Sequence, residues 1–256
     1  MCGRYRRRSD KQRIAEAFHV GMGLEDLYLE PDDDIAPGSM QPVVSTSEEG
    51  EREIALMRWG FKLPGRLIFN ARSEGIDQAR FWKDSFQQRR CIVPADAIFE
   101  WQKVARGKKP KAIPESLHLE AAALKSTRPS GSVDLPQDHE RARQLRNCCK
   151  YEISIPGREP FGMAGIWKFW KNPKTNQLER TFSVLTGAPN ELIEPIHDRL
   201  ATILDPRDYE EYLVPAERAP VHLLRIVPPE QMKVTRIEET KARKESPGLF
   251  DLTQNR

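Results

Sequence analysis

The chain has 256 residues, of which 38% are hydrophobic and 31% charged, and its formal net charge at pH 7 is only +3. It has no run of about 18 apolar residues and no apolar stretch at its start, which argues against a membrane span and a secretory leader, so we expect a soluble cytoplasmic protein. The balanced charge does not by itself indicate a nucleic-acid binder, and the four cysteines lack CxxC spacing, which argues against structural zinc and a disulfide framework.

The first part of the chain is expected to alternate strands with short helices. An N-terminal strand is followed by Ser9-Asp10-Lys11-Gln12, which has the pattern of a capping box ahead of an amphipathic helix. Ile35-Ala36-Pro37-Gly38 is typical of a turn. Apolar patterns predict strands at 41–46, 53–59 and 67–71, a helix at 78–89, and one buried strand at 91–101.

The second part begins with a change of composition. Residues 107–147 are rich in Pro, Ser, Lys and Arg, so we expect an insertion outside the core. Strands are predicted at 151–155, 161–170, 181–186, 201–204 and 232–237, with a helical turn at 189–196 and a capped helix at 205–213. Together these elements predict an α+β fold with a mainly antiparallel, barrel-like sheet core and peripheral helices, formed as one domain over 1–238 with a polar tail at 239–256.

The start of the chain offers an unusual reactive group. Cys2 follows Met1 and is small enough to permit removal of the initiator Met, so we expect the mature chain to begin with Cys2. An α-amine has a pKa of about 7.7–8.0 and a thiol one of about 8.5, so both supply usable nucleophile near neutral pH. An amine beside a β-thiol forms an imine with an aldehyde, and the thiolate then closes a thiazolidine ring.

Glu100 and His197 are candidates for proton transfer. Alternation along the strand places Glu100 on the face opposite Phe99 and Trp101, beside apolar neighbours, where partial burial raises a carboxyl pKa. His197 follows the predicted helical turn, and an imidazole can exchange protons near neutral pH. The simpler interpretations are a strand-end salt bridge and a structural histidine.

Asn70 and Arg72 are candidates for substrate binding. They follow an apolar strand and point to the same side if strand geometry persists, which combines an orienting amide with a phosphate-binding cation. The simpler interpretation is a turn Asn with an exposed Arg. Basic residues also gather at 4–8, 103–111 and 141–150, and acidic residues at 32–34 and 48–53, which is consistent with either a local basic groove or solvated faces.

Seven short motifs occur in the order found in the SOS-response-associated peptidase (SRAP) family, which the sequence resembles over most of its length outside the insertion. Members of that family form covalent crosslinks with abasic sites in single-stranded DNA. The motifs are Met1-Cys2-Gly3-Arg4, Ile35-Ala36-Pro37, Trp59-Gly60, Asn70-Ala71-Arg72-Ser73-Glu74, Phe99-Glu100-Trp101, Ala164-Gly165-Ile166-Trp167 and His197-Asp198-Arg199.

The resemblance implies a role for each matching residue. Cys2 would be the crosslinking nucleophile, Asn70 would hold the N-terminal residue and the opened sugar, Glu100 would move protons, and His197 would assist sugar opening and reversal. It further implies a monomer that acts on abasic single-stranded DNA in the DNA-damage response, at the nucleoid, without metal or cofactor. The implied DNA contacts are Arg4, Pro37, Arg72, Arg80, Trp101, Thr186 and Arg199.

The sequence departs from the family pattern in four places. Segment 60–66 lacks the Trp that members often use as a wedge, and Asp34 replaces the Asn that usually precedes Ile-Ala-Pro. Leu200-Ala201 replaces Met-Pro, and segment 234–238 lacks the familiar Asn.

Two other functions are consistent with the same residues. A thiol peptidase or amidase would use Cys2 as an N-terminal nucleophile, with Glu100 and His197 serving acyl transfer. A non-catalytic single-stranded DNA-binding module would bind DNA in a salt-sensitive way without forming a covalent adduct.

Overall fold

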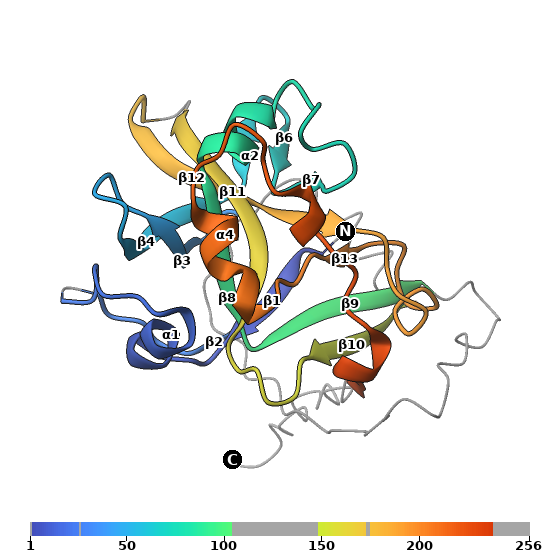
Figure 1. The fold of residues 1–256 in the computed structure, drawn as a ribbon. Helices are drawn as coiled ribbons and strands as arrows, with labels where there is room; N and C mark the ends of the chain where they lie inside the picture. Colours follow the sequence, from blue (N-terminus) through green and yellow to red (C-terminus); the bar gives the residue numbers. More distant parts are fainter. Residues whose placement is uncertain (1, 26, 104–147, 173–174, 238–256) are drawn as a thin grey trace, which may run out of the picture.

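The computed structural model describes residues 2–25, 27–103, 148–172 and 175–237 (Figure 1). The expected insertion at 107–147 and the tail at 239–256 lie outside the described residues, so the one-domain organisation stays a prediction. Within the described ranges no helix is long and apolar enough to cross a membrane.

Two antiparallel-rich sheets form the body of the described chain. A five-stranded sheet has the order β14-β10-β9-β1-β2 and is antiparallel throughout. A seven-stranded sheet has the order β11-β8-β3-β4-β12-β13, with β7 added beside β12, and only the β12–β4 and β12–β7 pairs are parallel. The first sheet contains β1 (Arg4–Arg7), β2 (Asp32–Ile35), β9 (Ala97–Lys103), β10 (Cys148–Ser154) and β14 (Lys233–Ile237).

The second sheet closes on itself because β11 pairs with both β8 and β12, which completes the ring β11-β8-β3-β4-β12. A short β5–β6 hairpin lies beside it. This confirms the predicted α+β fold with a mainly antiparallel, barrel-like core. The strands are β3 (Met40–Thr46), β4 (Arg52–Trp59), β5 (Phe61–Leu63), β6 (Arg66–Ile68), β7 (Asn70–Arg72), β8 (Arg90–Ala95), β11 (Phe161–Lys171), β12 (Leu178–Gly187) and β13 (Leu200–Ala201).

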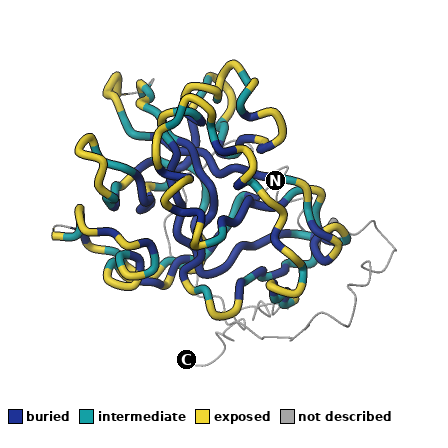
Figure 2. The backbone as a smooth tube through the Cα atoms, viewed as in Figure 1, coloured by how far each residue is buried: buried dark blue, intermediate teal, exposed yellow. Residues whose placement is uncertain are grey.

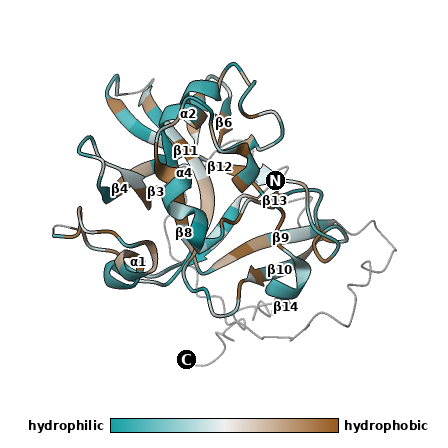
Figure 3. Cartoon of the chain, viewed as in Figure 1, coloured by the Kyte–Doolittle hydropathy of each residue, from teal (hydrophilic) through white to brown (hydrophobic). Residues whose placement is uncertain are grey.

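Two apolar cores lie on opposite faces of the closed sheet, because successive side chains of a strand point to opposite sides. In β8, Cys91 and Val93 belong to the core shared with the five-stranded sheet, whereas Ile92 belongs to the core beneath the helices. The central strands are accordingly buried (Figure 2), and apolar stretches mark strands such as β9 while peripheral loops are hydrophilic (Figure 3). The helices are α1 (Lys11–Phe18), α2 (Lys83–Gln88) and α4 (Tyr209–Leu213), with 3₁₀ turns η1 (Pro206–Asp208), η2 (Val221–Leu223) and η3 (Pro229–Gln231).

The prediction of one strand at 91–101 is wrong, because the chain bends at Asp96 between β8 and β9. The Asp96 carboxylate accepts hydrogen bonds from the backbone N–H groups of Arg8 and Ser9 and from the Ser9 hydroxyl, at 2.6 Å for the last. A buried carboxylate needs such donors. Asp96 therefore redirects the chain from the seven-stranded sheet into the five-stranded sheet and fixes the end of β1 beside it.

The same contact corrects the predicted helix start. Because the Ser9 hydroxyl is engaged by Asp96, Asp10 is the N-cap of α1 and accepts from the Arg13 N–H at 2.9 Å. The helix expected at 78–89 is also shorter: residues before α2 form turns after Gly75, whose φ is +67°.

Three further boundaries differ from expectation because tertiary pairing overrides local pattern. Segment 67–71 forms two strands, β6 and β7, that join different sheets. The strand at 201–204 is only β13, followed by a bridge between Ile203 and Met163. The helix at 205–213 begins as a 3₁₀ turn capped by Asp205 and continues as α4.

Gly162 in β11 allows α1 and α4 to approach the sheet, and replacing it tests that packing. A Cβ at this position would lie 2.6 Å from Ile92 Cγ2 and 3.0 Å from ring carbons of Phe18 and Tyr209. We expect Gly162→Ala to lower the free energy of unfolding by about 1–3 kcal/mol, the usual cost of overpacking a core. Urea denaturation measures this, and Gly21→Ala, whose Cβ meets nothing within 4 Å, should be near neutral. Equal effects of the two substitutions would contradict the packing role.

Candidate functional site

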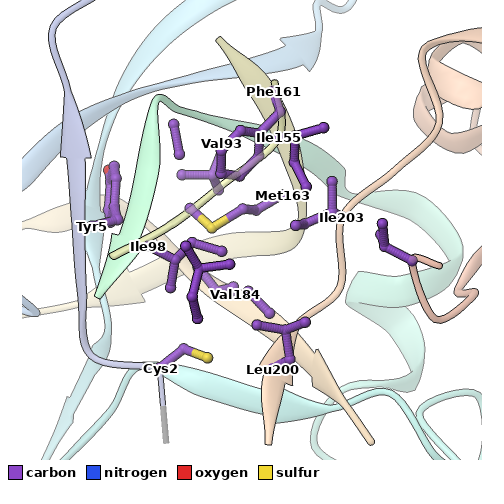
Figure 4. Close-up of a cluster of buried hydrophobic side chains, with 14 of the residues drawn as sticks. Cys2, Tyr5, Val93, Ile98, Ile155, Phe161, Met163, Val184, Leu200 and Ile203 are labelled. Carbon is purple, nitrogen blue, oxygen red and sulfur yellow. The ribbon is translucent and has the colours of Figure 1, made fainter. Parts of the chain in front are cut away.

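The pairing of β1 with β9 brings the start of the chain to Glu100. Arg4 pairs with Phe99 in this antiparallel ladder, so continuing the register by one residue brings Gly3 opposite Glu100. Cys2 lies at the end of the shared core and is only 4% exposed. Figure 4 shows its side chain among apolar residues that include Ile98, Val184 and Leu200.

Two segments from the other sheet hold Cys2 in place. The Asn70 side-chain Nδ2 donates a hydrogen bond of 2.8 Å to the Cys2 carbonyl oxygen. The Cys2 Sγ lies 4.0 Å from the carbonyl oxygen of Arg199, to which the thiol donates. Asn70 occupies the first position of β7, where it pairs with Val184 of β12. The site therefore joins residues from β1, β7, β9 and the segment before β13.

His197 is positioned by a helical turn, as the sequence predicts. Backbone hydrogen bonds join Glu194 N–H to Asn190 O at 2.9 Å and His197 N–H to Ile193 O at 2.9 Å. The buried side chain of Gln102 donates to the Pro195 carbonyl at 2.8 Å. Because Gln102 lies two residues after Glu100 on the same strand face, it holds this turn against the strand that carries Glu100.

The His197 ring then lies between Glu100 and its own backbone. His197 Nε2 is 3.9 Å from Glu100 Oε2, and Nδ1 is 3.0 Å from the nitrogen of the Arg199 N–H. Nδ1 also lies 3.1 Å from the Arg199 carbonyl oxygen, so it accepts from that N–H or donates to that carbonyl according to the tautomer of the ring, while Nε2 faces the Glu100 carboxylate. Nδ1 is also 3.1 Å from Asp198 Oδ1. The geometry suits a residue that moves protons to and from Glu100.

Burial dominates the electrostatics of the two reactive groups. Burial, followed by the charge of Glu100 and a hydrogen bond to it, raises the pKa of the Cys2 thiol well above its usual value. Burial also raises the pKa of Glu100, against the opposing charge of His197. A buried thiolate and a buried carboxylate side by side repel each other, so the site favours protonated forms.

Three buried polar atoms of the site make no hydrogen bond to another described residue. They are Asn70 Oδ1, Glu100 Oε1 and Arg199 Nε. Leaving a buried polar atom unpaired costs about 1–3 kcal/mol, so such atoms require an explanation. Asn70 and Glu100 both contact Cys2, so their unpaired oxygens are placed to accept hydrogen bonds from a polar ligand there. Among the described residues no cluster of three or more His, Cys, Asp or Glu side chains is arranged to hold a metal ion.

The predicted DNA-contacting arginines fall into two groups. Arg4 forms an ion pair of 2.5 Å with Asp34, and Arg199 forms a bidentate pair with Glu74 at 2.7 and 2.8 Å. Arg72 is exposed and makes no ion pair with another described residue. A phosphate could therefore contact Arg72 without displacing a carboxylate.

Arg80 stands apart from the other predicted residues. We expected it in a helix, but it lies in a turn before α2, because that helix begins only at Lys83. It is exposed and makes no hydrogen bond or ion pair to the site within the part of the chain that the structure describes. Its predicted DNA contact stays a prediction.

The remaining predicted contacts come from β12, from the turn after β2 and from β9. Thr186 pairs with Arg72 in the β12–β7 ladder, and its carbonyl accepts from the Arg199 guanidinium. Pro37 is half-buried in the turn after β2. Trp101 follows Glu100, and the Lys150 ammonium lies 5.4 Å from its ring centroid.

Four contributing residues were not found from the sequence. Gln102 could have been predicted from the sequence, because its two-residue spacing from Glu100 places it on the same face of the strand. Glu74 belongs to the Asn70 motif, but its pairing with Arg199 joins residues 125 apart in the sequence. Asp34 and Lys150 belong to charge runs whose partners depend on strand register, which composition alone does not give.

Comparisons with known proteins agree on one family. A family model described as SOS response associated peptidase (SRAP) matches residues 1–242. The abasic site processing protein YoqW of Bacillus subtilis is 26% identical over 237 residues, covering 90% of this chain and 87% of that protein. The abasic site processing protein HMCES of Xenopus tropicalis is 24% identical over 201 residues, covering 72% of this chain and 53% of that one.

Solved structures share the fold. A Bacteroides thetaiotaomicron protein superposes with a TM-score of 0.67 at 19% identity, covering 93% of this chain and 92% of that one. A phage-related protein from Bordetella bronchiseptica gives 0.63 at 21% identity, covering 93% and 95%.

Glu100 is expected to destabilise the protein at neutral pH. Burial raises the folded-state pKa of Glu100, so folding favours its protonated form. The resulting stabilisation of the folded protein is complete below the unfolded-state pKa of about 4.3 and is lost as the pH rises through the folded-state pKa. We therefore expect Glu100→Gln to be more stable than the parent at about pH 7–8, with the difference vanishing near about pH 4. Thermal unfolding across this range measures it, since 1 kcal/mol shifts Tm by about 2–4 °C in a chain of this size.

The matched control is Glu49→Gln, which removes a carboxylate from the exposed turn between β3 and β4. It should show no pH-dependent gain. A Glu100→Gln protein that is less stable than the parent at every pH would contradict the burial argument.

Proposed function

Because the chain belongs to the SOS response associated peptidase (SRAP) family, we propose that it processes abasic sites in single-stranded DNA by a covalent crosslink through Cys2. The observation that best supports this is the contact of Cys2 with Asn70 and Glu100, with His197 beside Glu100, in a buried site with unpaired polar atoms. Removal of Met1 would expose the α-amine of Cys2 in that site. The reaction would take place at the nucleoid, without a metal or dissociable cofactor.

The first step of the proposed reaction opens the sugar. An abasic deoxyribose is mostly a closed hemiacetal, which must lose the proton of its C1′ hydroxyl and gain one on the ring oxygen. The His197 ring, with Nε2 toward Glu100, is placed to exchange these protons. Opening exposes the C1′ aldehyde, whose oxygen can accept hydrogen bonds from the site.

The second step forms the imine. The α-amine of Cys2 attacks C1′ and one of its protons passes to the aldehyde oxygen. A protonated Glu100 then donates its proton to the departing hydroxyl, so water leaves, and a protonated imine remains beside the Glu100 carboxylate. A raised pKa suits Glu100 to this role because burial favours the protonated carboxyl that donates. Asn70 holds the Cys2 carbonyl meanwhile and so keeps the amine oriented.

The third step closes the ring. The Cys2 sulfur bonds to C1′ of the protonated imine, the electron pair of the C=N π bond passes to nitrogen, and the thiol proton passes to the Glu100 carboxylate. The nitrogen keeps the proton that it already carries, which becomes the ring N–H. The raised pKa of the thiol supports this order, because the thiol keeps its proton until the neighbouring carboxylate is free to accept it. The resulting thiazolidine removes the imine that would otherwise promote β-elimination and strand scission.

The proposed DNA path runs past the opening of the site. Arg72, Arg4 and Arg199 would contact phosphates, and Trp101 would stack on a base, an interaction worth about 1–3 kcal/mol. Lys150 near the Trp101 ring adds a cation beside this stacking surface. Pro37 and Thr186 would line the path, with Arg80 at its periphery.

The two other functions differ in their products. A thiol peptidase or amidase turns over an amide, and it requires a thiolate, which the buried setting of Cys2 disfavours. A non-catalytic module binds DNA but leaves no covalent product. A stable adduct with an abasic oligonucleotide therefore separates the proposed function from both.

The adduct is expected to depend on Cys2 alone among the cysteines. On a denaturing gel, the parent protein should shift an abasic single-stranded oligonucleotide, and Cys2→Ala should abolish the stable band, although the alanine amine can still give imine-based cleavage. Cys149→Ala removes another free cysteine, which is half-buried, and should leave the band intact. The N-terminal mass must show Cys2 as the first residue. A verified Cys2 terminus that binds the oligonucleotide without any adduct would contradict the proposed chemistry.

Arg72 is expected to contribute one phosphate contact. Neutralising a phosphate on single strands gives a slope of about −0.7 in log K against log salt concentration, so Arg72→Ala should weaken binding and make the slope shallower by about that amount. Fluorescence anisotropy with an oligonucleotide lacking abasic sites measures this apart from the chemistry. Arg207→Ala, which removes an arginine that is 74% exposed in η1, is the control. An equal change in the two slopes would reject a specific contact.

A further inference from the structure

The acidic strand β2 carries a bulge that turns two adjacent carboxylates toward the arginines of β1. The register between the strands shifts by one residue between Tyr5 and Arg7, so Arg6 lies opposite two residues, Asp33 and Asp34. In a regular strand, adjacent side chains point to opposite faces. The extra residue of a bulge breaks that alternation locally. Asp33 and Asp34 can therefore both face the outer row of β1.

Each arginine of that outer row is paired with a carboxylate. Arg4 Nη1 lies 2.5 Å from Asp34 Oδ2, and Arg8 Nε lies 2.6 Å from Asp33 Oδ1. Arg6 instead reaches over Ala97 of β9 to form a bidentate pair at 2.7 Å with Glu152 of β10. Three of the four arginines at 4–8 are therefore paired with carboxylates within the fold.

The Arg4–Asp34 pair differs from the others in its place. Arg4 is two residues from Cys2 and pairs with Phe99, the neighbour of Glu100, so it stands at the edge of the site. Its side chain is 40% exposed and that of Asp34 51% exposed, so an incoming phosphate can reach the guanidinium. Arg8 lies four residues further along β1, which is about 13 Å at the usual strand rise of about 3.3 Å.

We propose that Asp34 occupies a phosphate position on Arg4 in the free protein and is exchanged for a DNA phosphate when single-stranded DNA binds. The proposal rests on the proposed function, because it requires that the bound DNA strand passes Arg4. A carboxylate and a phosphate use the same bidentate geometry on a guanidinium, so one can replace the other at the same atoms. Asp34 thereby sets how tightly the strand is held beside Cys2.

The exchange is energetically accessible because the pair is exposed to solvent. Exposed ion pairs are individually weak. Removing the competing carboxylate is therefore expected to tighten binding by about two- to fivefold, the range that such pairs allow. The gain in affinity should depend on Arg4 and not on the net charge of β2.

Asp33 provides a matched control for this distinction. Asp34→Asn and Asp33→Asn remove the same charge from adjacent positions of one bulge, and each frees one arginine of β1. Equilibrium binding to an oligonucleotide without abasic sites, followed by fluorescence anisotropy at fixed salt, should show the two- to fivefold gain for Asp34→Asn only. Arg4→Ala should weaken binding, and Asp34→Asn placed in the Arg4→Ala background should give no further gain.

The outcomes separate this proposal from the proposed function. Equal gains for Asp33→Asn and Asp34→Asn would overturn the exchange in favour of a general charge effect. A loss of affinity in Asp34→Asn would also overturn it, because Asp34 would then hold Arg4 in its binding position. If Arg4→Ala weakens binding but Asp34→Asn changes nothing, the exchange alone fails. If Arg4→Ala also leaves affinity unchanged, the phosphate contact in the proposed function fails with it. Unchanged thermal unfolding of each variant confirms that binding is compared between folded proteins.

Discussion

The antiparallel pairing of β1 with β9 is the constraint on which the site depends. It begins where Arg4 meets Phe99, and the Asp96 carboxylate fixes its other end by accepting from the backbone of Arg8 and Ser9. A ladder held at both ends leaves one register for the residues before Arg4, so Cys2 can lie only at the edge of the shared core. A one-residue slip would turn every side chain of β1 to the opposite face and remove Tyr5 from that core.

The same arrangement makes the site costly to maintain. Cys2 and Glu100 are buried, and both pKa shifts disfavour the charged forms that solvent would stabilise. Apolar packing around Cys2 and the clamp from Gln102 to the Pro195 carbonyl hold these groups in contact despite that cost. Polar atoms left unpaired in a packed interior are expected where a ligand will complete them, since a purely structural core would have selected apolar side chains.

Much of this could be predicted from the sequence, because it depended on local patterns. Strand alternation alone turned Glu100 away from Trp101, and the order of the motifs brought Asn70 and His197 into the same hypothesis. What failed depended on distant partners. The break at Asp96 is set by Arg8 and Ser9, which follow β1 and lie 88 and 87 positions away in the sequence. No pattern within 91–101 carries that information.

The partners of the charge runs also depend on residues distant in the sequence. Their positions give DNA binding and the proposed chemistry different dependences on ionic strength. The basic start of the chain is consistent with a basic groove or with a solvated face, and the strand register decides that Arg4 pairs with Asp34 in solvent, whereas Glu100 and His197 meet in the interior. Exposed charges are screened over about 8–10 Å at physiological salt, and buried ones much less. Ionic strength should therefore act on the capture of the strand through residues such as Arg72, while the proton transfers around Cys2 depend on burial and geometry and remain largely insulated from it.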